Sequence, residues 1–357
     1  MNLDFIHDVP ATRVVFGAGR IRDAGEELDR LGATRVLVIA GGPESVFADR
    51  VCADLGDRVV GRYTDVQMHV PVDNAERARA FAKDVDADCL LAVGGGSALG
   101  TAKAIAMTSH LPILAIPTTY AGSEMTPIWG LTEGSLKTTG RDLAVLPRTV
   151  IYDPEVTLTL PAELSACSGM NALAHLVEAL YAQGTSPVSF LQAKEGIRAL
   201  ASALPRVVAQ PTDLAARAEA QYGAWLAGWA LGTTGMGVHH KICHTLGGTF
   251  NLPHAQAHTV VLPYAIAFNN DYAPEAMQAI LDAFAEAGRP AATAAEAVRA
   301  LAEDIGAPTN LADFGFTEAD AGRAAELITQ SQYPNPRVVD SQSIQALLEA
   351  ASRGDAP

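Results

Sequence analysis

Histidine and asparagine side chains recur at helical spacing in two segments of the chain. Residues four positions apart lie on one face of a helix, one turn from each other. Three such pairs are present: His240 with His244, His254 with His258, and Asn171 with His175. Three helices would therefore direct imidazole and amide groups to one place, which is the geometry of a metal site or a proton-transfer site. Histidines scattered over helix faces and helix ends are the plain alternative.

A run of glycines marks a candidate phosphate site. Gly94, Gly95, Gly96 and Ser97 follow the apolar segment DCLLAV and precede the helical segment ALGTAKAIAM. Glycine lets the backbone approach a ligand closely. The helix that follows offers free N–H groups and the positive end of its dipole, and a serine can cap it or donate to a phosphate oxygen. The alternative is a tight strand-to-helix turn that needs small residues.

Two other predicted strand ends carry candidate cofactor-binding residues. Thr118 and Thr119 follow another predicted strand, and their hydroxyl groups could reach a nucleotide. The apolar segment RVLVIA ends in Gly41 and Gly42, at a point where an acidic residue would bind the ribose of NAD and repel the 2′-phosphate of NADP. The G-x-G-x-x-G fingerprint of an ordinary dinucleotide-binding domain is absent. The sequence therefore leaves both NADH and NADPH open.

The segments around these residues predict two domains. In residues 1–153, apolar β-branched runs alternate with helical segments, which predicts a doubly wound α/β domain with a mainly parallel sheet. In residues 154–357, Ala-rich amphipathic segments separated by proline or glycine predict an all-α domain. The active site is expected in the cleft between the two domains. The predicted strands are residues 12–16, 35–40, 88–93, 114–116 and 149–152. The predicted helices of the second domain are residues 170–182, 188–208, 213–231, 238–248, 254–269, 274–287, 292–304, 317–330 and 341–352.

The composition excludes several classes of protein. The chain has 357 residues, of which 49% are apolar and 18% charged, and its formal net charge is −15. A chain this acidic, with no cluster of Lys and Arg, is not expected to bind nucleic acid. The four cysteines are dispersed, so neither a disulfide framework nor a thiolate zinc site is expected. No signal peptide and no membrane-spanning run is recognisable, and the cytoplasm is the expected location.

Five motifs, in their order along the chain, resemble the iron-containing alcohol dehydrogenase family, whose fold is similar to that of dehydroquinate synthase. They are GGGS, PTTYAGSE, GMNALAH, GVHHKICHTLGG and LPHAQAH. The resemblance covers nearly the whole chain, from FGAGR to the last helices. It implies NADH or NADPH as the cofactor and a homodimer. It also places Ser123 and His244 at the cofactor, together with the glycines and threonines named above.

The resemblance also implies a metal site and a departure from it. In the metal-dependent members, an Asp, a His one helical turn later and two further His hold one divalent ion. By motif position the ligands fall on Asn171, His175, His240 and His254. An Asn side chain is neutral and binds a metal through its carbonyl oxygen, more weakly than a carboxylate does. We therefore expect no tightly held metal here, and a vestigial site that serves as a proton donor and anion-binding site.

Within the family the chain resembles the maleylacetate reductases, through PHAQAH, GRDLAVLPRTVIYDP and YPNPR. The implied reaction reduces the C2=C3 bond of maleylacetate, a dicarboxylate, to 3-oxoadipate during the degradation of aromatic compounds. Hydride would add to C2 and a proton to C3. The implied catalytic residues are His244, His254, His258, His175 and His240. The candidate cations for the two carboxylates are Lys241, Arg148 and Arg337.

Two other activities stay open at this point. One is a metal-dependent alcohol dehydrogenase that interconverts a primary alcohol and an aldehyde with the same fold and cofactor. Only Asn171 and the additional His258 speak against it. The other is a lyase of the dehydroquinate synthase type, which would use bound NAD⁺ without net oxidation of NADH.

Overall fold

The computed structural model describes residues 5–134 and 136–357. Contacts between residues divide the chain into two compact units: Val9–Leu160, and Pro161–Pro357 together with residues 5–8. The first unit extends beyond the boundary that the sequence predicts after residue 153. The additional segment belongs to this unit because Val156 is buried in the unit's apolar cluster. Just before it, the carboxylate of Asp153 accepts hydrogen bonds from the backbone N–H groups of Gly19 and Ile21 at 3.0 and 2.9 Å.

The first unit is built on a parallel sheet. Among the described residues six strands form it, in the order β1-β8-β5-β4-β2-β3, and every neighbouring pair is parallel. Strands β2, β4 and β5 are buried along their whole length, as their continuous apolar runs predict. The bounds are β1 (Arg13–Phe16), β2 (Val36–Ile39), β3 (Val59–Tyr63), β4 (Cys89–Gly94), β5 (Ile113–Pro117) and β8 (Thr149–Tyr152).

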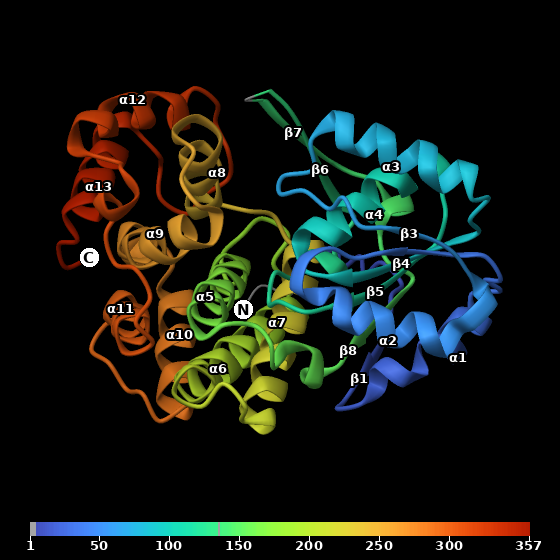
Figure 1. Ribbon diagram of the computed structural model, residues 1–357. Coiled ribbons are helices and arrows are strands. Elements are labelled where there is room, and N and C mark those ends of the chain that lie inside the picture. The colour runs from blue at the N-terminus through green and yellow to red at the C-terminus, as the bar shows by residue number, and fades with distance from the viewer. Residues whose placement is uncertain (1–4, 135) are drawn as a thin grey trace. The chain divides into compact units, whose positions relative to one another are not determined.

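Helices cover both faces of this sheet (Figure 1), which confirms the predicted doubly wound α/β fold. Helices α1 (Ala24–Arg30) and α2 (Ser45–Leu55) share one apolar cluster with the strands. Helices α3 (Val72–Asp84) and α4 (Gly96–Ser109) lie on the other face. The chain continues from β2 to β3 in one direction and from β4 to β5 in the other, so the strand order reverses between β2 and β4. In such sheets ligands bind at the carboxyl ends of the strands at this switch point.

Several elements of this unit lie outside the sequence-based prediction. Strand β3, with the sequence VVGRY, contains a glycine and an arginine, and only Tyr63 is buried. Strands β6 (Ile128–Glu133) and β7 (Leu136–Arg141) form a separate antiparallel pair, and β6 is only half-buried. Weak burial gives these strands little apolar patterning, which is the signal that sequence-based prediction needs.

Among the described residues of the second unit every regular element is a helix, as the sequence predicts. Several of its helices begin at a side chain that caps the first turn. Ser186, Thr293 and Asp340 each accept a hydrogen bond from the backbone N–H group three residues later. The bounds are α5 (Ala162–Ala179), α6 (Pro187–Ala209), α7 (Leu214–Thr233), α8 (Val238–Phe250), α9 (His254–Asn269), α10 (Pro274–Glu286), α11 (Ala294–Asp304), α12 (Glu318–Thr329) and α13 (Ser341–Arg353).

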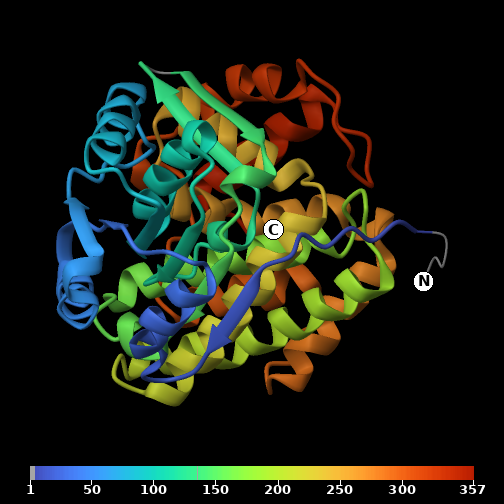
Figure 2. The ribbon, with the colours of Figure 1, turned by 90° about the vertical axis from the view of Figure 1, so that its right-hand side faces the viewer.

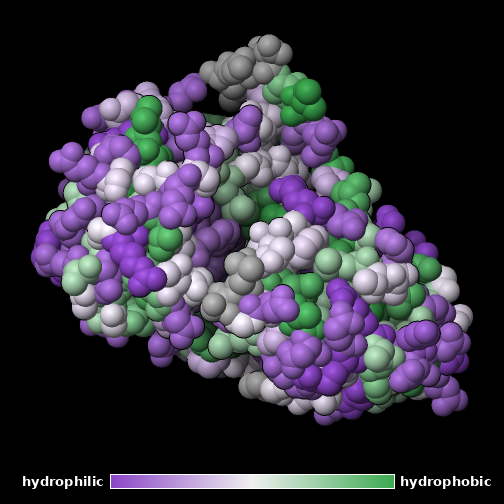
Figure 3. Space-filling model, turned by 90° about the horizontal axis from the view of Figure 1, so that it is seen from above, coloured by the Kyte–Doolittle hydropathy of each residue, from purple (hydrophilic) through white to green (hydrophobic). Residues whose placement is uncertain are grey.

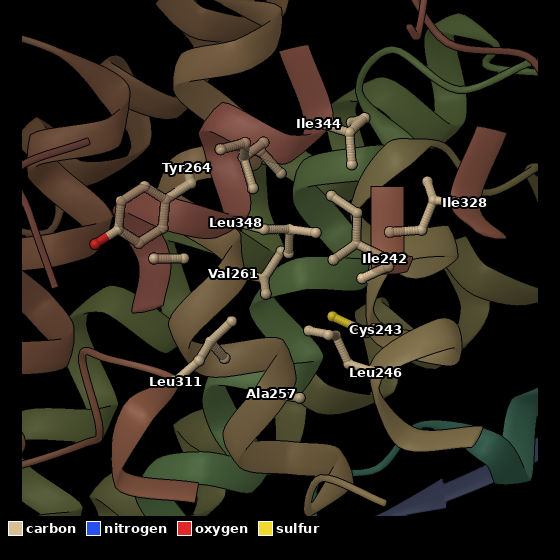
Figure 4. Close-up of a cluster of buried hydrophobic side chains, with 14 of the residues drawn as sticks. Ile242, Cys243, Leu246, Ala257, Val261, Tyr264, Leu311, Ile328, Ile344 and Leu348 are labelled. Carbon is tan, nitrogen blue, oxygen red and sulfur yellow. The ribbon is translucent and has the colours of Figure 1, made fainter. Parts of the chain in front are cut away.

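Helices α8 and α9 pack their apolar faces into one cluster with α12 and α13 (Figure 4). On α8 the fully buried residues Val238, Ile242 and Leu246 recur every fourth position. On α9, Ala257 and Val261 do the same. Burying an aliphatic side chain of this size contributes roughly 1.5–3 kcal/mol. The cluster therefore fixes the rotation of both helices about their axes, and with it the direction of the histidines on their other faces.

Residues 5–8 lie against the helical unit (Figure 2). Nδ1 of His7 is 3.1 Å from Oγ of Ser186, the residue that caps α6. The ring of His7 lies 5.5 Å from that of Trp229 on α7. These contacts explain why the segment groups with the second unit although it precedes β1.

Hydrophilic side chains cover most of the face of the molecule shown in Figure 3, and hydrophobic ones are scattered among them. This surface accords with the formal net charge of −15. Among the described residues, every helix is too short or too polar to cross a membrane.

The close packing of α5 on α6 predicts a specific cost of adding one methyl group. A Cβ on Gly169 would lie 2.3 Å from Cδ2 of Leu204, which is fully buried and cannot turn toward solvent. We expect Gly169→Ala to lower the free energy of unfolding by about 1–3 kcal/mol, measured by urea denaturation. The matched control is Gly322→Ala on α12, where the nearest atom to the new Cβ lies at 3.7 Å. That variant should gain up to about 1 kcal/mol, and equal midpoints for the two variants would contradict the packing argument.

Candidate active site

The glycine loop joins β4 to α4 at the switch point of the sheet. Gly94 has φ of 148°, and a Cβ there would lie 2.9 Å from Cβ of Ala98. A Cβ on Gly95 would lie 2.9 Å from Cγ2 of Thr119. A Cβ on Gly96 would meet no atom of the described residues within 4 Å. Packing within the unit therefore explains the first two glycines, while the third leaves space for a ligand to approach.

The first turn of α4 has the features of an anion site. Its N-cap residue is Gly95, and among the described residues no side chain caps it. The first N–H groups of a helix have no partner within the helix, and they carry the positive end of its dipole. Ser97 is half-buried in this turn. Such a turn has the donors that bind a diphosphate, and binding of a dinucleotide by these residues stays a prediction.

The turn that follows β5 lies beside the glycine loop. The backbone N–H of Thr118 donates to the carbonyl oxygen of Gly94 at 3.3 Å, and Thr119 is the neighbour that fills the space beside Gly95. Oγ1 of Thr118 is buried and has no hydrogen-bond partner among the described residues. Gly41 and Gly42, at the carboxyl end of β2, lie at the same edge of the sheet. The structure thus places the glycine loop, Thr118 and Thr119 side by side, with Gly41 and Gly42 at the same edge of the sheet.

Lys103 of α4 anchors the segment that carries Ser123, and sequence reasoning missed it. The ammonium group is buried and donates to the carbonyl oxygens of Ser123, Thr126 and Ile128 at 2.7, 2.8 and 2.8 Å. Burial lowers the pKa of Lys103 to about 7. A lysine inside the apolar run AKAIAM was the available signal, because a buried lysine needs several oxygen partners.

In the helical unit, three helices supply the polar cluster that the spacing predicts. Asn171 and His175 lie on α5, His240 and His244 on α8, and His254 and His258 on α9. The ring centroids of His175 and His240 are 4.8 Å apart, and those of His240 and His258 are 5.0 Å apart. The rings of His254 and His258 approach to 4.3 Å. The i and i+4 pairs therefore converge from three helices.

A line of hydrogen-bond contacts crosses this cluster from Glu178 to Asn171. Nδ1 of His240 lies 2.5 Å from Oε2 of Glu178. Nε2 of His240 lies 2.7 Å from Nδ1 of His175. Nε2 of His175 lies 3.4 Å from Nδ2 of Asn171. All four side chains are at least nine-tenths buried.

The chemistry of these groups gives the line a direction. Burial lowers the pKa of His240, which favours a neutral ring with one N–H group. Since a carboxylate only accepts hydrogen bonds, that N–H is on Nδ1 and donates to Glu178. Nε2 of His240 then accepts from Nδ1–H of His175, whose Nε2 accepts from the amide of Asn171. The N–H groups of His175 and His240 are thus committed within the protein.

Glu178 is the second functional residue that sequence reasoning missed. Its carboxylate accepts hydrogen bonds from the backbone N–H groups of Gly237 and His239 at 2.9 and 2.8 Å, at the start of α8. The N–H of Val238 between them donates to Oδ1 of Asn335 at 3.2 Å. Burial raises the pKa of Glu178, and the attraction of His239 and the backbone donors oppose that shift. The i, i+4, i+7 spacing from Asn171 through His175 to Glu178 was the available signal.

Exposure divides the predicted catalytic histidines into two groups. His175, His240 and His258 are 7, 3 and 0% exposed. His244 and His254 are exposed, and their rings lie nearly parallel with centroids 6.5 Å apart. Burial lowers the pKa of His258 well below its usual range. Within this unit, only His244 and His254 of the five present their rings at the surface.

The four positions that the family uses for metal ligands do not fit one ion as they are arranged here. Two ring nitrogens on one tetrahedral ion lie about 3.3 Å apart, given bonds of roughly 2.0–2.1 Å. The 2.7 Å between His240 and His175 is shorter and is a hydrogen-bond distance. Asn171 also offers no negative charge.

A second group, His239, His240 and His258, brings one ring nitrogen of each residue within 4.8 Å of the others. Both ring nitrogens of His240 already have partners, in Glu178 and His175. Nε2 of His239 lies 3.1 Å from the carbonyl oxygen of His258. This group also lacks an anionic ligand, so it does not make a better metal site than the first.

The three predicted cations for the substrate lie in different surroundings. Lys241 is half-buried on α8, three residues before His244, with Nζ 3.4 Å from Oγ of Ser331. The guanidinium of Arg337 stacks on the ring of Phe268 at 4.2 Å. Arg148 precedes β8 and so lies at the amino edge of the sheet, opposite the glycine loop. The structure brings Lys241 to the exposed histidines and gives Arg148 no place beside the glycine loop.

Comparison with known proteins gives full-length relatives. The maleylacetate reductase of Delftia acidovorans is 50% identical over 355 residues, which is 99% of each chain. The maleylacetate reductase of Burkholderia cepacia is 49% identical over 353 residues, again 99% of each chain. The crystal structure of maleylacetate reductase from Agrobacterium tumefaciens is 41% identical and superposes with a TM-score of 0.95 over 100% of both chains.

Two family models match nearly the whole chain. The model for iron-containing alcohol dehydrogenase matches residues 11–154. The model for the C-terminal part of the Fe-containing alcohol dehydrogenase family matches residues 165–352. The chain therefore belongs to the iron-containing alcohol dehydrogenase family, as the order of its motifs predicts.

Proposed function

We propose that this protein reduces maleylacetate to 3-oxoadipate at the expense of NADH or NADPH. The observation that carries the proposal is the identity of 50% with a maleylacetate reductase over 99% of both chains. Family membership alone leaves the reaction open, because alcohol dehydrogenases share the fold. Asn171 agrees with the reductase, since this reaction requires no Lewis acid.

The reduction asks three things of the protein. The cofactor, when bound, supplies the hydride that adds to C2 of the substrate. The 4-keto group then carries the negative charge as an enolate, and C3 must receive a proton. Hydrogen-bond donors or an imidazolium can stabilise an enolate oxygen, and an imidazole with a pKa of about 6.5 suits the proton step. The two carboxylates of the substrate also need partners.

His244 and His254 meet the requirement for a proton donor best. Their rings are exposed in the helical unit, while the N–H groups of His175 and His240 are committed within the protein. A group that protonates a substrate must come within hydrogen-bond reach of it. We therefore assign proton transfer and enolate binding to His244 and His254, and the orientation of this pair to His175, His240 and His258.

Lys241 is the preferred partner for one substrate carboxylate. It lies one helical turn before His244 on α8, so the two side chains share a face. Its ammonium group lies 6.0 Å from the ring centroid of Tyr333. Arg337 is held by its stack on Phe268 and by a hydrogen bond to Oγ of Ser343 at 3.3 Å, so it would have to exchange those contacts to bind a substrate.

The α/β unit supplies the cofactor site in this proposal. Gly95, Gly96 and Ser97 bind the diphosphate at the start of α4, and Thr118 and Thr119 lie along the adenosine half. The support is the uncapped first turn of α4 and the free space at Gly96.

Two alternatives use the same fold. A metal-dependent alcohol dehydrogenase would need a tightly bound ion and would lose activity to a chelator. A lyase of the dehydroquinate synthase type would turn over without net oxidation of NADH. The homodimer, the cytoplasmic location and the role in the degradation of aromatic compounds stay predictions from the resemblance.

Activity without metal is the first test. Protein stripped with EDTA and checked for metal content should oxidise NADH when maleylacetate is added, at a rate that Fe²⁺ or Zn²⁺ does not raise. The reason is that Asn171 removes the anionic ligand and that His175 and His240 bind each other. The measurement is the loss of NADH absorbance in steady state. Activity that appears only after metal is restored would favour the alcohol dehydrogenase, and aldehydes would then be assayed.

The assignment of His244 predicts a loss of turnover without a loss of stability. His244→Gln should lower kcat by about 10²-fold or more, which is the contribution that general acid catalysis usually makes. Its melting temperature should not change, because the side chain is exposed. The control is His110→Asn at the end of α4, a position with φ of 56° that Asn tolerates. Equal kcat values for the two variants would remove His244 from the mechanism.

The space at Gly96 predicts an effect on cofactor binding alone. In Gly96→Val the new Cβ has no atom of the described residues within 4 Å, so we expect the melting temperature to stay unchanged. The same side chain would crowd the diphosphate at a cost of about 1–3 kcal/mol, and 1.4 kcal/mol corresponds to about tenfold in affinity. We expect the KM for NADH to rise about tenfold or more while the KM for maleylacetate stays within twofold. An unchanged KM for NADH would place the diphosphate elsewhere.

A further inference from the structure

We infer that Glu44 binds the hydroxyl groups of the adenosine ribose and makes the enzyme prefer NADH to NADPH. The inference rests on the proposed site of the cofactor at the glycine loop. It goes beyond that proposal because the sequence, which ends strand β2 in two glycines, leaves both cofactors open.

The topology of the sheet decides where the ribose lies. The diphosphate site follows β4, and β2 is hydrogen-bonded to β4 in parallel register, with Ile39 opposite Ala92. Neighbouring strands are about 4.8 Å apart, so the residues that follow β2 lie one strand away from the diphosphate. In doubly wound sheets an acidic residue at this point accepts hydrogen bonds from the ribose hydroxyl groups.

An acidic residue, Glu44, stands three residues after Gly41, the position where an acid is expected, and the backbone turns so that its side chain lies near the end of β2. Gly42 has φ of 62°, a left-handed conformation that turns the chain into a short 3₁₀ helix, η2 (Gly42–Glu44). As a result Oε2 of Glu44 lies 3.4 Å from the position that a Cβ on Gly42 would occupy. The carboxylate of Glu44 therefore lies next to Gly42, close to the carboxyl end of β2.

The carboxylate of Glu44 has no hydrogen bond or ion pair among the described residues. Two acidic residues near Glu44 in the same unit do form ion pairs. Asp49 is paired with Arg62 of β3, and Asp65 with Arg77 of α3. Those two arginines are thus already matched by acids, and Glu44 is left to bind a ligand.

The charge of Glu44 sets the direction of the preference. A carboxylate accepts hydrogen bonds from the 2′- and 3′-hydroxyl groups of NADH. NADPH carries a phosphate on the 2′-oxygen, and two negative groups in contact repel each other strongly at low ionic strength. The same residue therefore attracts one cofactor and rejects the other.

The experiment measures the dissociation constants of NADH and NADPH, without substrate, by titration of dinucleotide fluorescence on the full chain. Wild-type protein should bind NADH about tenfold more tightly than NADPH. Glu44→Gln should reduce that ratio about fivefold or more, mainly by tighter binding of NADPH, and added salt should narrow the ratio in the wild type only. The control is Asp54→Asn near the end of α2, an exposed acid that changes the net charge equally. The control should keep the wild-type ratio.

Three outcomes would overturn the inference: a wild type that binds both cofactors equally, a Glu44→Gln ratio within twofold of the wild type, or an equal change in Asp54→Asn. A fourth outcome has another meaning. If Gly96→Val binds NADH as tightly as the wild type in the same titration, the cofactor site itself is misplaced, and the proposed function loses its support before Glu44 is judged.

Discussion

The histidine cluster of the helical unit depends on the buried carboxylate of Glu178. It is 1% exposed and accepts backbone hydrogen bonds from Gly237 and His239, the residues on either side of the start of α8. A helix N-terminus carries partial positive charge, which stabilises an anion there and offsets part of the cost of burying it. The same carboxylate holds Nδ1 of His240. One side chain therefore sets both where α8 begins and how its first functional imidazole is turned.

The neutral residue at position 171 follows from that arrangement. With Nδ1–H of His240 given to Glu178, Nε2 of His240 must accept, and Nε2 of His175 must accept in turn. An amide can donate to Nε2 of His175, whereas a carboxylate would set a negative charge against a lone pair. An acid at this position needs a cation beside it, either a metal or a protonated ring. A neutral amide at position 171 is therefore consistent with two neutral histidines that hydrogen-bond to each other.

The pattern of apolar residues in the sequence predicted the helices and strands that have a fully buried face, and it missed the weakly buried strands. Strand β8 (Thr149–Tyr152) and helix α9 (His254–Asn269) agree with the predicted residues 149–152 and 254–269, because one is buried on both faces and the other has clear proline and asparagine boundaries. Strand β3, interrupted by Gly61 and Arg62, gave no such signal. The convergence of Asn171, His175 and His240 was predictable from i, i+4 spacing. The roles of Glu178 and Lys103 were not, because each depends on backbone groups of distant segments, Gly237 in one case and Ser123 in the other.

The glycines of the loop after β4 have different causes: two are required by packing, and one leaves space for a ligand. Gly94 and Gly95 are required by their own unit, since any Cβ would press on Ala98 or Thr119. Only Gly96 has free space beside it, so only Gly96 carries information about a ligand. The same reasoning applies at the end of β2. An acid is expected directly after the strand, where Gly41 and Gly42 stand, but the left-handed turn at Gly42 brings Glu44 back over the same place. A backbone turn can thus bring a carboxylate to a place where the residues directly after the strand have none, and the preference for a cofactor has to be judged from where the carboxylate lies.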